Sequence, residues 1–297
     1  MDNNKIIEKY IQESNEISNK YNYNPNIRYL LKIIIPAFII KYSLKREKII
    51  LDTFKNTKIY ISNKQSPNIN AFYSSNPIRE NNKIITKKMI VINNFEKQNL
   101  IELLDSLIHE FNHAINSYNN EIKITNNLIL LRTGLSNIAY DYQTLLYKEK
   151  NNSYVLEEII NTKQTEEIID IIKSFNNPLV NDTIYAINNE TDNNYNSKSY
   201  YLESSICQKI LKNRTFISTL ENLRITGNID DIEDWFDNIT GIKNSYQNLI
   251  NNLKKIIDLE SEYLKVKFLK NIKLNQIKKL SQKTLYIIDT FTKNTKY

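Results

Sequence analysis

The chain has 297 residues, of which 41% are hydrophobic, and a formal net charge of +7. This length and content suffice for one large or two small packed domains, and the charges are spread along the chain, so we expect no dedicated nucleic-acid site. The single cysteine, Cys207, excludes an intramolecular disulfide and a CxxC metal site, and we expect it in the core. Few glycines and prolines (3 and 5) favour long helices joined by asparagine-rich loops.

The first 57 residues are predicted to form a helical segment. Residues 1–21 are polar and amphipathic and lack the apolar centre of a signal peptide. Residues 29–44 are the most apolar stretch, but charged residues and Pro36 interrupt it, and it is shorter than the ~20 residues that span a bilayer. It predicts a buried helix or a pair of helices broken at Pro36. With no signal or membrane span visible, we expect a cytoplasmic protein.

Short strands are predicted next. Residues 59–61, 69–73 and 89–92 are rich in β-branched and aromatic side chains, and each run is bounded by Asn, Ser or Pro. A small sheet therefore precedes the next helix.

That helix is predicted from Asn93, as N-cap with Glu96 three residues on, to about residue 118. Its residues 107–116 read LIHEFNHAIN and contain the only two histidines, His109 and His113. One helical turn apart, both imidazoles can reach a single metal ion while Glu110 projects beside them, which is the HExxH arrangement of zinc hydrolases.

The pattern around the histidines separates this interpretation from an incidental pair of surface histidines. One arc of the helix is apolar, and the opposite arc carries both histidines among acidic and small polar residues. A solvated helix face would more usually hold Lys and Arg, and this arc has neither. The pattern is typical of a helix that lines an active site.

Beyond this helix, residues 121–136 are predicted to form a hairpin that turns at Asn126 and Asn127 and closes on Gly134. Within it, Arg132 either contacts substrate or pairs with an acid. A loop is expected over residues 141–153. Residues 154–175 then have strong helical character and carry the carboxylates from which a third metal ligand must come.

The sequence HEFNHAIN resembles the active-site helix of the zincin metallopeptidases, in particular the thermolysin-like and lethal-factor-like branches. The triplet at residues 70–72, Asn-Ala-Phe, is similar to one on the strand that pairs with peptide substrates in some zincins. The resemblance implies an α+β fold, in which a small mixed sheet lies above the HExxH helix and the C-terminal half is mainly helical. It implies three parts: residues 1–57, a catalytic core at 58–175, and a helical region at 176–297 that completes the cleft.

The resemblance also implies a function and a ligand set. It implies a zinc-dependent peptidase of the gluzincin type, with Zn²⁺ as cofactor, a peptide or protein as substrate and Glu110 as general base. The run LEEIIN is similar to the gluzincin segment that supplies the third ligand, which points to Glu158. Glu157 is the close alternative and Glu166 is less favoured.

Two residues that follow Glu158, Asn161 and Thr162, are expected to contact the ligands. The run lacks the aspartate that gluzincins use there, so orientation of the histidines is expected from Asn116, Asp105 or a backbone carbonyl.

The C-terminal region is predicted to be helical over residues 197–223, 229–236 and 244–297, the last of these basic. Because both histidines are ligands, a donor to the oxyanion of peptide hydrolysis would be Tyr200, Tyr201 or Arg132. The alternative function is a non-catalytic zincin-like protein or basic helical binding protein. Glu110 argues against it, because a structural metal site has no use for a general base.

Overall fold

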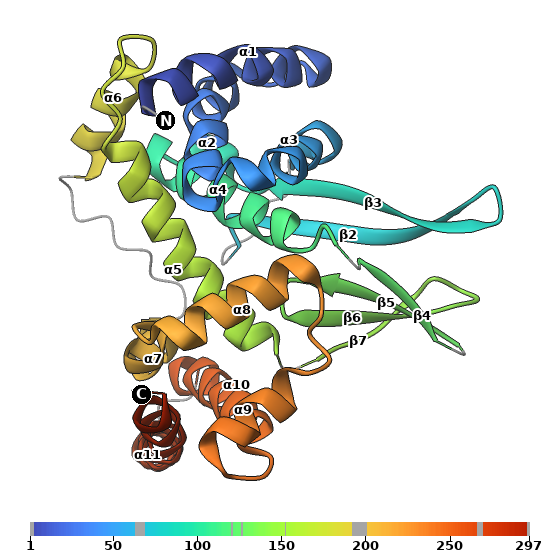
Figure 1. The fold of residues 1–297 in the computed structure, drawn as a ribbon, viewed down its shortest axis with the longest axis vertical. Coiled ribbons are helices and arrows are strands. Elements are labelled where there is room, and N and C mark those ends of the chain that lie inside the picture. Colours follow the sequence, from blue (N-terminus) through green and yellow to red (C-terminus); the bar gives the residue numbers. More distant parts are fainter. Residues whose placement is uncertain are drawn as a thin grey trace. The chain divides into compact units, whose positions relative to one another are not determined.

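The computed structural model describes residues 3–62, 69–119, 121–125, 127–151, 153–191, 201–265 and 270–295. Two compact units contain them: Met1–Tyr118 with Asn161–Ser197, and Asn119–Ile160 with Lys198–Tyr297. The boundary falls inside one uninterrupted helix, α5 (Tyr154–Lys173), which supplies residues to both units (Figure 1). The division into residues 1–57, 58–175 and 176–297 stays a prediction.

The first unit is largely helical. It contains α1 (Asn3–Tyr21), α2 (Pro25–Tyr42), α3 (Glu47–Asn56), α4 (Leu100–Asn116), the second part of α5, and α6 (Asn181–Thr191), with two short 3₁₀ turns at Leu44–Arg46 and Phe95–Lys97. The apolar stretch forms one helix, α2, with Pro36 inside it, rather than a broken pair. The Asn24 side chain caps this helix by accepting from the N–H of Asn26 at 2.9 Å, and Pro25 occupies its first turn, where no N–H is needed.

Three strands form the mixed sheet of this unit: β1 (Lys58–Ile61), β2 (Ala71–Glu80) and β3 (Lys83–Ile92), in the order β1-β3-β2. β1 runs parallel to β3, and β2 runs antiparallel to it. β2 and β3 form a hairpin and are longer than the strands predicted at residues 69–73 and 89–92. Its two-residue turn, Asn81 and Asn82, has φ values of 48° and 61°, the left-handed conformation that such tight turns need and that Asn tolerates. Pro77 does not end the strand because β2 is an outer strand of the sheet.

Helix α4 packs against β2 and β3, and it begins later than predicted (Figure 1). Its N-cap is Asn99, whose side chain accepts from the N–H of Glu102 at 2.9 Å, while the Glu102 carboxylate accepts from the N–H of Asn99 at 3.2 Å. The predicted cap, Asn93 with Glu96, was wrong because Asn94 adopts a left-handed conformation and a 3₁₀ turn intervenes. A reciprocal capping box therefore fixes the start of the helix that carries the histidines.

The second unit contains a four-stranded antiparallel sheet in the order β4-β5-β6-β7: β4 (Ile122–Thr125), β5 (Leu128–Thr133), β6 (Ser136–Asp141) and β7 (Tyr147–Lys150). The predicted hairpin is confirmed as β4 and β5, although residue 126 of its turn lies outside the described residues. Strand β7 lies where a loop was predicted. The Asp141 side chain accepts from the N–H groups of Gln143 and Thr144, which reverses the chain toward β7.

Five helices complete the second unit: α7 (Tyr201–Leu211), α8 (Arg214–Thr226), α9 (Ile232–Thr240), α10 (Ser245–Lys265) and α11 (Lys270–Asn294). The helix predicted over residues 197–223 is two helices, because Asn213 caps the second by accepting from the N–H of Phe216 at 2.9 Å. Phe216, Phe236 and Phe291 pack together in the core, where Cys207 is buried as predicted.

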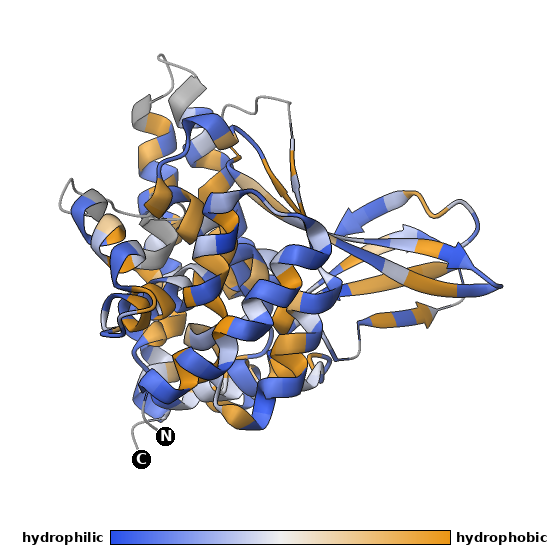
Figure 2. Ribbon diagram, turned by 90° about the horizontal axis from the view of Figure 1, so that it is seen from above, coloured by the Kyte–Doolittle hydropathy of each residue, from blue (hydrophilic) through white to orange (hydrophobic). Residues whose placement is uncertain are grey.

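Most helices carry hydrophobic and hydrophilic residues side by side, as expected for elements that bury one face (Figure 2). The α+β class is confirmed, with a small mixed sheet and a mostly helical C-terminal half. Within the described ranges, no helix combines the length and apolar character that crossing a membrane requires. The expected cytoplasmic location stays a prediction.

Candidate metal centre

The two histidines of the HExxH motif lie one turn apart on α4. Their ring centroids are 4.9 Å apart and the rings are inclined by 78°, so both imidazoles are available to one site. His113 is buried, whereas His109 is half-buried. The polar arc predicted for this helix is therefore largely enclosed by protein.

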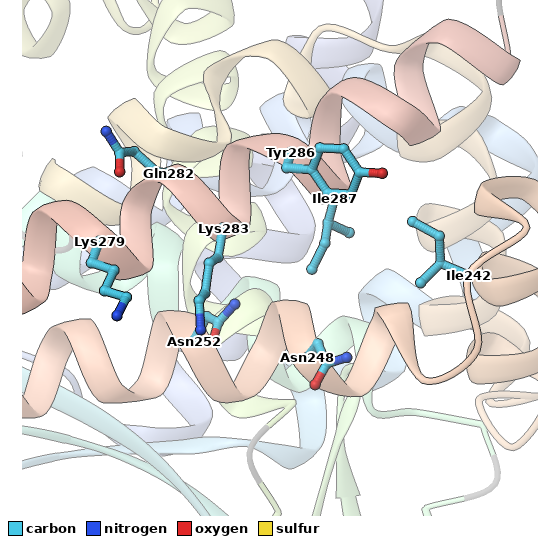
Figure 3. A pocket seen from close by; sticks show the side chains of 8 residues that line it. All are labelled: Ile242, Asn248, Asn252, Lys279, Gln282, Lys283, Tyr286 and Ile287. Carbon is cyan, nitrogen blue, oxygen red and sulfur yellow. The ribbon is translucent and has the colours of Figure 1, made fainter.

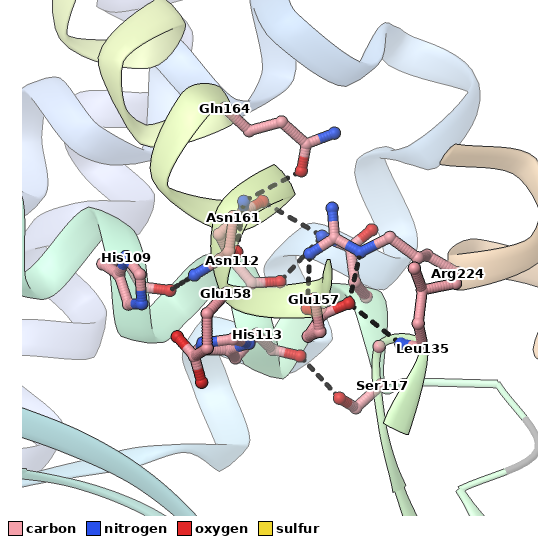
Figure 4. A network of polar contacts seen from close by, with 12 residues as sticks. His109, Asn112, His113, Ser117, Leu135, Glu157, Glu158, Asn161, Gln164 and Arg224 are labelled. Carbon is pink, nitrogen blue, oxygen red and sulfur yellow. Dashed lines mark hydrogen bonds and ion pairs between the residues drawn. The ribbon is translucent and has the colours of Figure 1, made fainter. Parts of the chain in front are cut away.

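Side chains hold the main chain of both histidines. Asn161 on α5 donates its amide to the carbonyl of His109 at 2.8 Å, and the hydroxyl of Ser117 donates to the carbonyl of His113 at 2.6 Å (Figure 4). The predicted contact from Asn161 is thus confirmed, although it reaches the backbone of His109 rather than its ring. The Thr162 hydroxyl is buried and makes no hydrogen bond within the described residues, so its role stays a prediction.

A buried amide network ties α4 to α5. The Asn112 amide donates to Asn161 Oδ1 at 2.6 Å and to Gln164 Oε1 at 3.0 Å, and the Tyr42 hydroxyl of α2 donates to Asn112 Oδ1. Asn116 also donates to Asn112, at 2.8 Å to its carbonyl. Sequence reasoning missed Tyr42, Asn112 and Gln164. Because these side chains are buried and hydrogen-bonded, they fix how the two helices meet beside the histidines.

Glu110 is held by the sheet. Its carboxylate accepts a hydrogen bond of 2.6 Å from the N–H of Tyr73 in β2, and its side chain is buried. In an antiparallel outer strand, alternate N–H groups point away from the neighbouring strand, and that of Tyr73 points at α4. The strand predicted to lie beside the motif therefore contacts the proposed base through its main chain.

Glu158 is the carboxylate that joins the two histidines. One ligand atom from each of His109, His113 and Glu158 lies within 4.8 Å of the others, an arrangement that could hold a metal ion. The donor set is two imidazole nitrogens and one carboxylate oxygen, which suits a divalent transition metal with a position left open. Glu158 also forms a long ion pair of 3.9 Å with Lys150.

The close alternative, Glu157, has a different set of contacts. It is 1% exposed, and both of its carboxylate oxygens bond to the guanidinium of Arg224, at 2.6 and 2.9 Å. The third candidate, Glu166, is exposed and does not belong to the histidine group. Of the three glutamates, the structure brings only Glu158 together with the histidines within the described residues.

The three candidate oxyanion donors have different outcomes. Arg132 is 2% exposed and donates to the carbonyls of Asn119, Gly134 and Arg224, the last two at 2.7 Å. These bonds describe a structural role in the second unit, and the two roles expected from the sequence stay predictions. Tyr200 lies outside the described residues, and Tyr201 begins α7 with a side chain that the structure does not describe.

Comparison with family models, with curated proteins and with solved structures finds no match to this chain. The zincin resemblance therefore depends on the HExxH residues of α4 and on the geometry of the group formed by His109, His113 and Glu158.

Proposed function

We propose that the chain is a zinc-dependent metallopeptidase of the gluzincin type. His109, His113 and Glu158 would bind the metal, and Glu110 would act as general base. The observation that carries the proposal is the proximity of the three ligand atoms, all within 4.8 Å, on the two helices where HExxH and a downstream glutamate were expected. Two histidines and one carboxylate are the ligand set of several zinc peptidases.

A bound zinc ion would lower the pKa of a coordinated water and polarise the scissile carbonyl. Glu110 would accept the proton from that water and deliver it to the leaving amine. The N–H of Tyr73 orients the Glu110 carboxylate by donating to its Oε2 at 2.6 Å. Burial of Glu110 limits competition from bulk water.

The outer position of β2 supports a peptide substrate. An extended peptide can add to a strand edge through main-chain hydrogen bonds, and β2 is one of the two outer strands of its sheet in the described part of the chain. The same strand bonds to Glu110 through Tyr73, so a peptide paired with it would lie beside the proposed base.

The first test is metal content. We expect one zinc ion per chain after dialysis against metal-free buffer and reloading, because one group with the required donors is present in the described residues. Elemental analysis of the parent and of the His109→Ala/His113→Ala double variant, together with digestion of a peptide library, measures this. Parent protein that stays near zero zinc after reloading would contradict the proposal, as would zinc content that is unchanged in the double variant.

A second candidate function is an anion-binding role for the C-terminal helices, and one surface feature favours it. α10 and α11 enclose a groove of about 550 Å³, within the size range of small-molecule sites (Figure 3). Lys279 and Lys283, one turn apart on α11, line it opposite Asn248 and Asn252 of α10, with Tyr286 along one side. No carboxylate is among the described residues that line it.

Several acids of the two helices pair with lysines that do not line the groove. Three carboxylates of α10 and α11 form ion pairs with lysines outside the groove: Asp258 with Lys254, Glu262 with Lys273, and Asp289 with Lys209. Lys279 and Lys283 give the lining of the groove a positive charge, and Tyr286 gives it an aromatic wall. The chemistry fits a phosphate or carboxylate attached to an aromatic or apolar body.

Phenyl phosphate is the probe for this groove. We expect Lys279→Gln and Lys283→Gln each to weaken its binding by about 10-fold, the scale of one charge-assisted hydrogen bond. Calorimetric titration of parent and variants measures this, with Lys293→Gln, also on α11, as the matched control. Equal affinity of all four proteins, or no binding to the parent, would exclude this second function.

A further inference from the structure

We propose that Arg224 is a positioning residue for the third metal ligand: its ion pair with Glu157 fixes the first turn of α5 and thereby the direction of the Glu158 carboxylate. This inference rests on the proposed metal site. It assigns a role to a residue far from the HExxH motif in the sequence.

The ion pair of Arg224 and Glu157 has a rigid, two-bond geometry. Arg224 Nε donates to Glu157 Oε2 at 2.9 Å and Arg224 Nη2 donates to Glu157 Oε1 at 2.6 Å, a two-bond fork that fixes both position and orientation. The side chains are 0% and 1% exposed. No rotation of either group is possible without breaking a buried hydrogen bond.

The turn between β5 and β6 encloses the same carboxylate. The N–H of Leu135 donates to Glu157 Oε2 at 2.9 Å. Gly134 has a φ of +58°, and a Cβ at this position would lie 2.0 Å from Glu157 Oε2. Only a glycine therefore leaves room for the carboxylate here. Arg132 in turn donates to the carbonyl of Arg224 at 2.7 Å, which holds the end of α8.

The energetics favour a positioning role. A buried ion pair is a weak source of stability, since well-packed apolar residues of similar size often serve as well or better. This pair instead fixes how the first turn of α5, next to Glu158, is oriented about the helix axis. Successive side chains of a helix point in fixed relative directions, so anchoring Glu157 sets where Glu158 points. The ion pair of Glu158 with Lys150 is long, at 3.9 Å, and partly exposed, so it constrains the Glu158 carboxylate less than the buried pair constrains that of Glu157.

The test uses the Glu157→Met/Arg224→Met double variant, which removes both buried charges together and so avoids leaving one unpaired. We expect its metal-free form to fold and to unfold somewhat below the temperature of the metal-free parent, because the N–H of Leu135 loses its acceptor. Its zinc dissociation constant, measured by chelator competition, is expected to rise by roughly 10- to 100-fold, the scale for losing a group that orients a ligand. The visible spectrum of the cobalt-loaded protein should change as well, because Glu158 no longer sits in the same geometry.

Lys41→Met/Glu167→Met is the matched control, because it removes another ion pair of α5 whose Nζ to Oε2 distance is 2.5 Å. We expect it to keep parental zinc affinity and the parental cobalt spectrum. Arg224→Lys keeps the positive charge but loses the two-bond geometry, so its zinc affinity should lie between those of the parent and the double variant. If the double variant does not fold, the zinc affinity of Arg224→Lys tests the positioning role.

Parental affinity and spectrum in folded Glu157→Met/Arg224→Met, or in Arg224→Lys, would show that the pair is structural only. Failure of the parent to bind zinc would instead overturn the proposed function itself. The parent measurement therefore distinguishes the two failures.

Discussion

Glu110→Gln is expected to abolish peptide hydrolysis while leaving the fold and the metal in place. The glutamine oxygen can still accept the hydrogen bond that the N–H of Tyr73 now donates to Glu110 at 2.6 Å, so β2 and α4 keep their contact. An amide cannot accept a proton from water, however, and general-base catalysis contributes roughly 10²- to 10⁴-fold. Turnover should fall by at least this factor on a peptide that the parent cuts.

Two measurements accompany that assay. Zinc content and the thermal unfolding temperature should match those of the parent, because Glu110 is not among the metal-ligand group. Glu166→Gln, which neutralises an exposed carboxylate on α5, serves as the control and should keep parental turnover. Parental turnover in Glu110→Gln would rule out the proposed mechanism even if zinc is bound.

Local pattern was sufficient to predict the histidine helix and the helix that carries Glu158. The spacing of His109 and His113 depends on the pitch of one helix, and that pitch does not change with the rest of the fold. The helix predicted over residues 154–175 is observed as α5 for the same reason, since its apolar residues recur at helical spacing.

The choice between Glu157 and Glu158 could not be made from the sequence. The two are adjacent, and their roles differ because Arg224, a distant residue on α8, meets the first of them. Arg132 and Asn112 pose the same problem, because in a sequence a buried polar side chain looks like an exposed one. Each acquires its role from partners that only the folded chain brings together.

Strands β2 and β3 were predicted too short, as residues 69–73 and 89–92, for a reason of turn chemistry. The residues before Pro77 look like a turn, whereas the actual turn uses Asn81 and Asn82 in left-handed conformations. Proline is tolerated in β2 because an outer strand has N–H groups that its neighbour does not use. The order of the strands in the sheet, which the sequence does not reveal, therefore decides whether Pro77 ends the strand.

Glu158→Ala should remove the zinc-dependent part of the protein's stability. Its ion pair with Lys150, at 3.9 Å, is long and partly exposed, so loss of that pair costs little, and the metal-free form of each protein is the reference for its zinc response. Loss of one of three ligands should weaken zinc binding by more than about 100-fold, beyond the range for groups that only orient ligands.

Ligand binding stabilises a fold in proportion to the logarithm of ligand concentration over the dissociation constant. Added zinc should therefore raise the unfolding temperature of the parent but hardly that of the Glu158→Ala variant. Glu166→Ala on the same helix is the control and should respond to zinc as the parent does. An equal zinc response in Glu158→Ala and the parent would remove Glu158 from the ligand set.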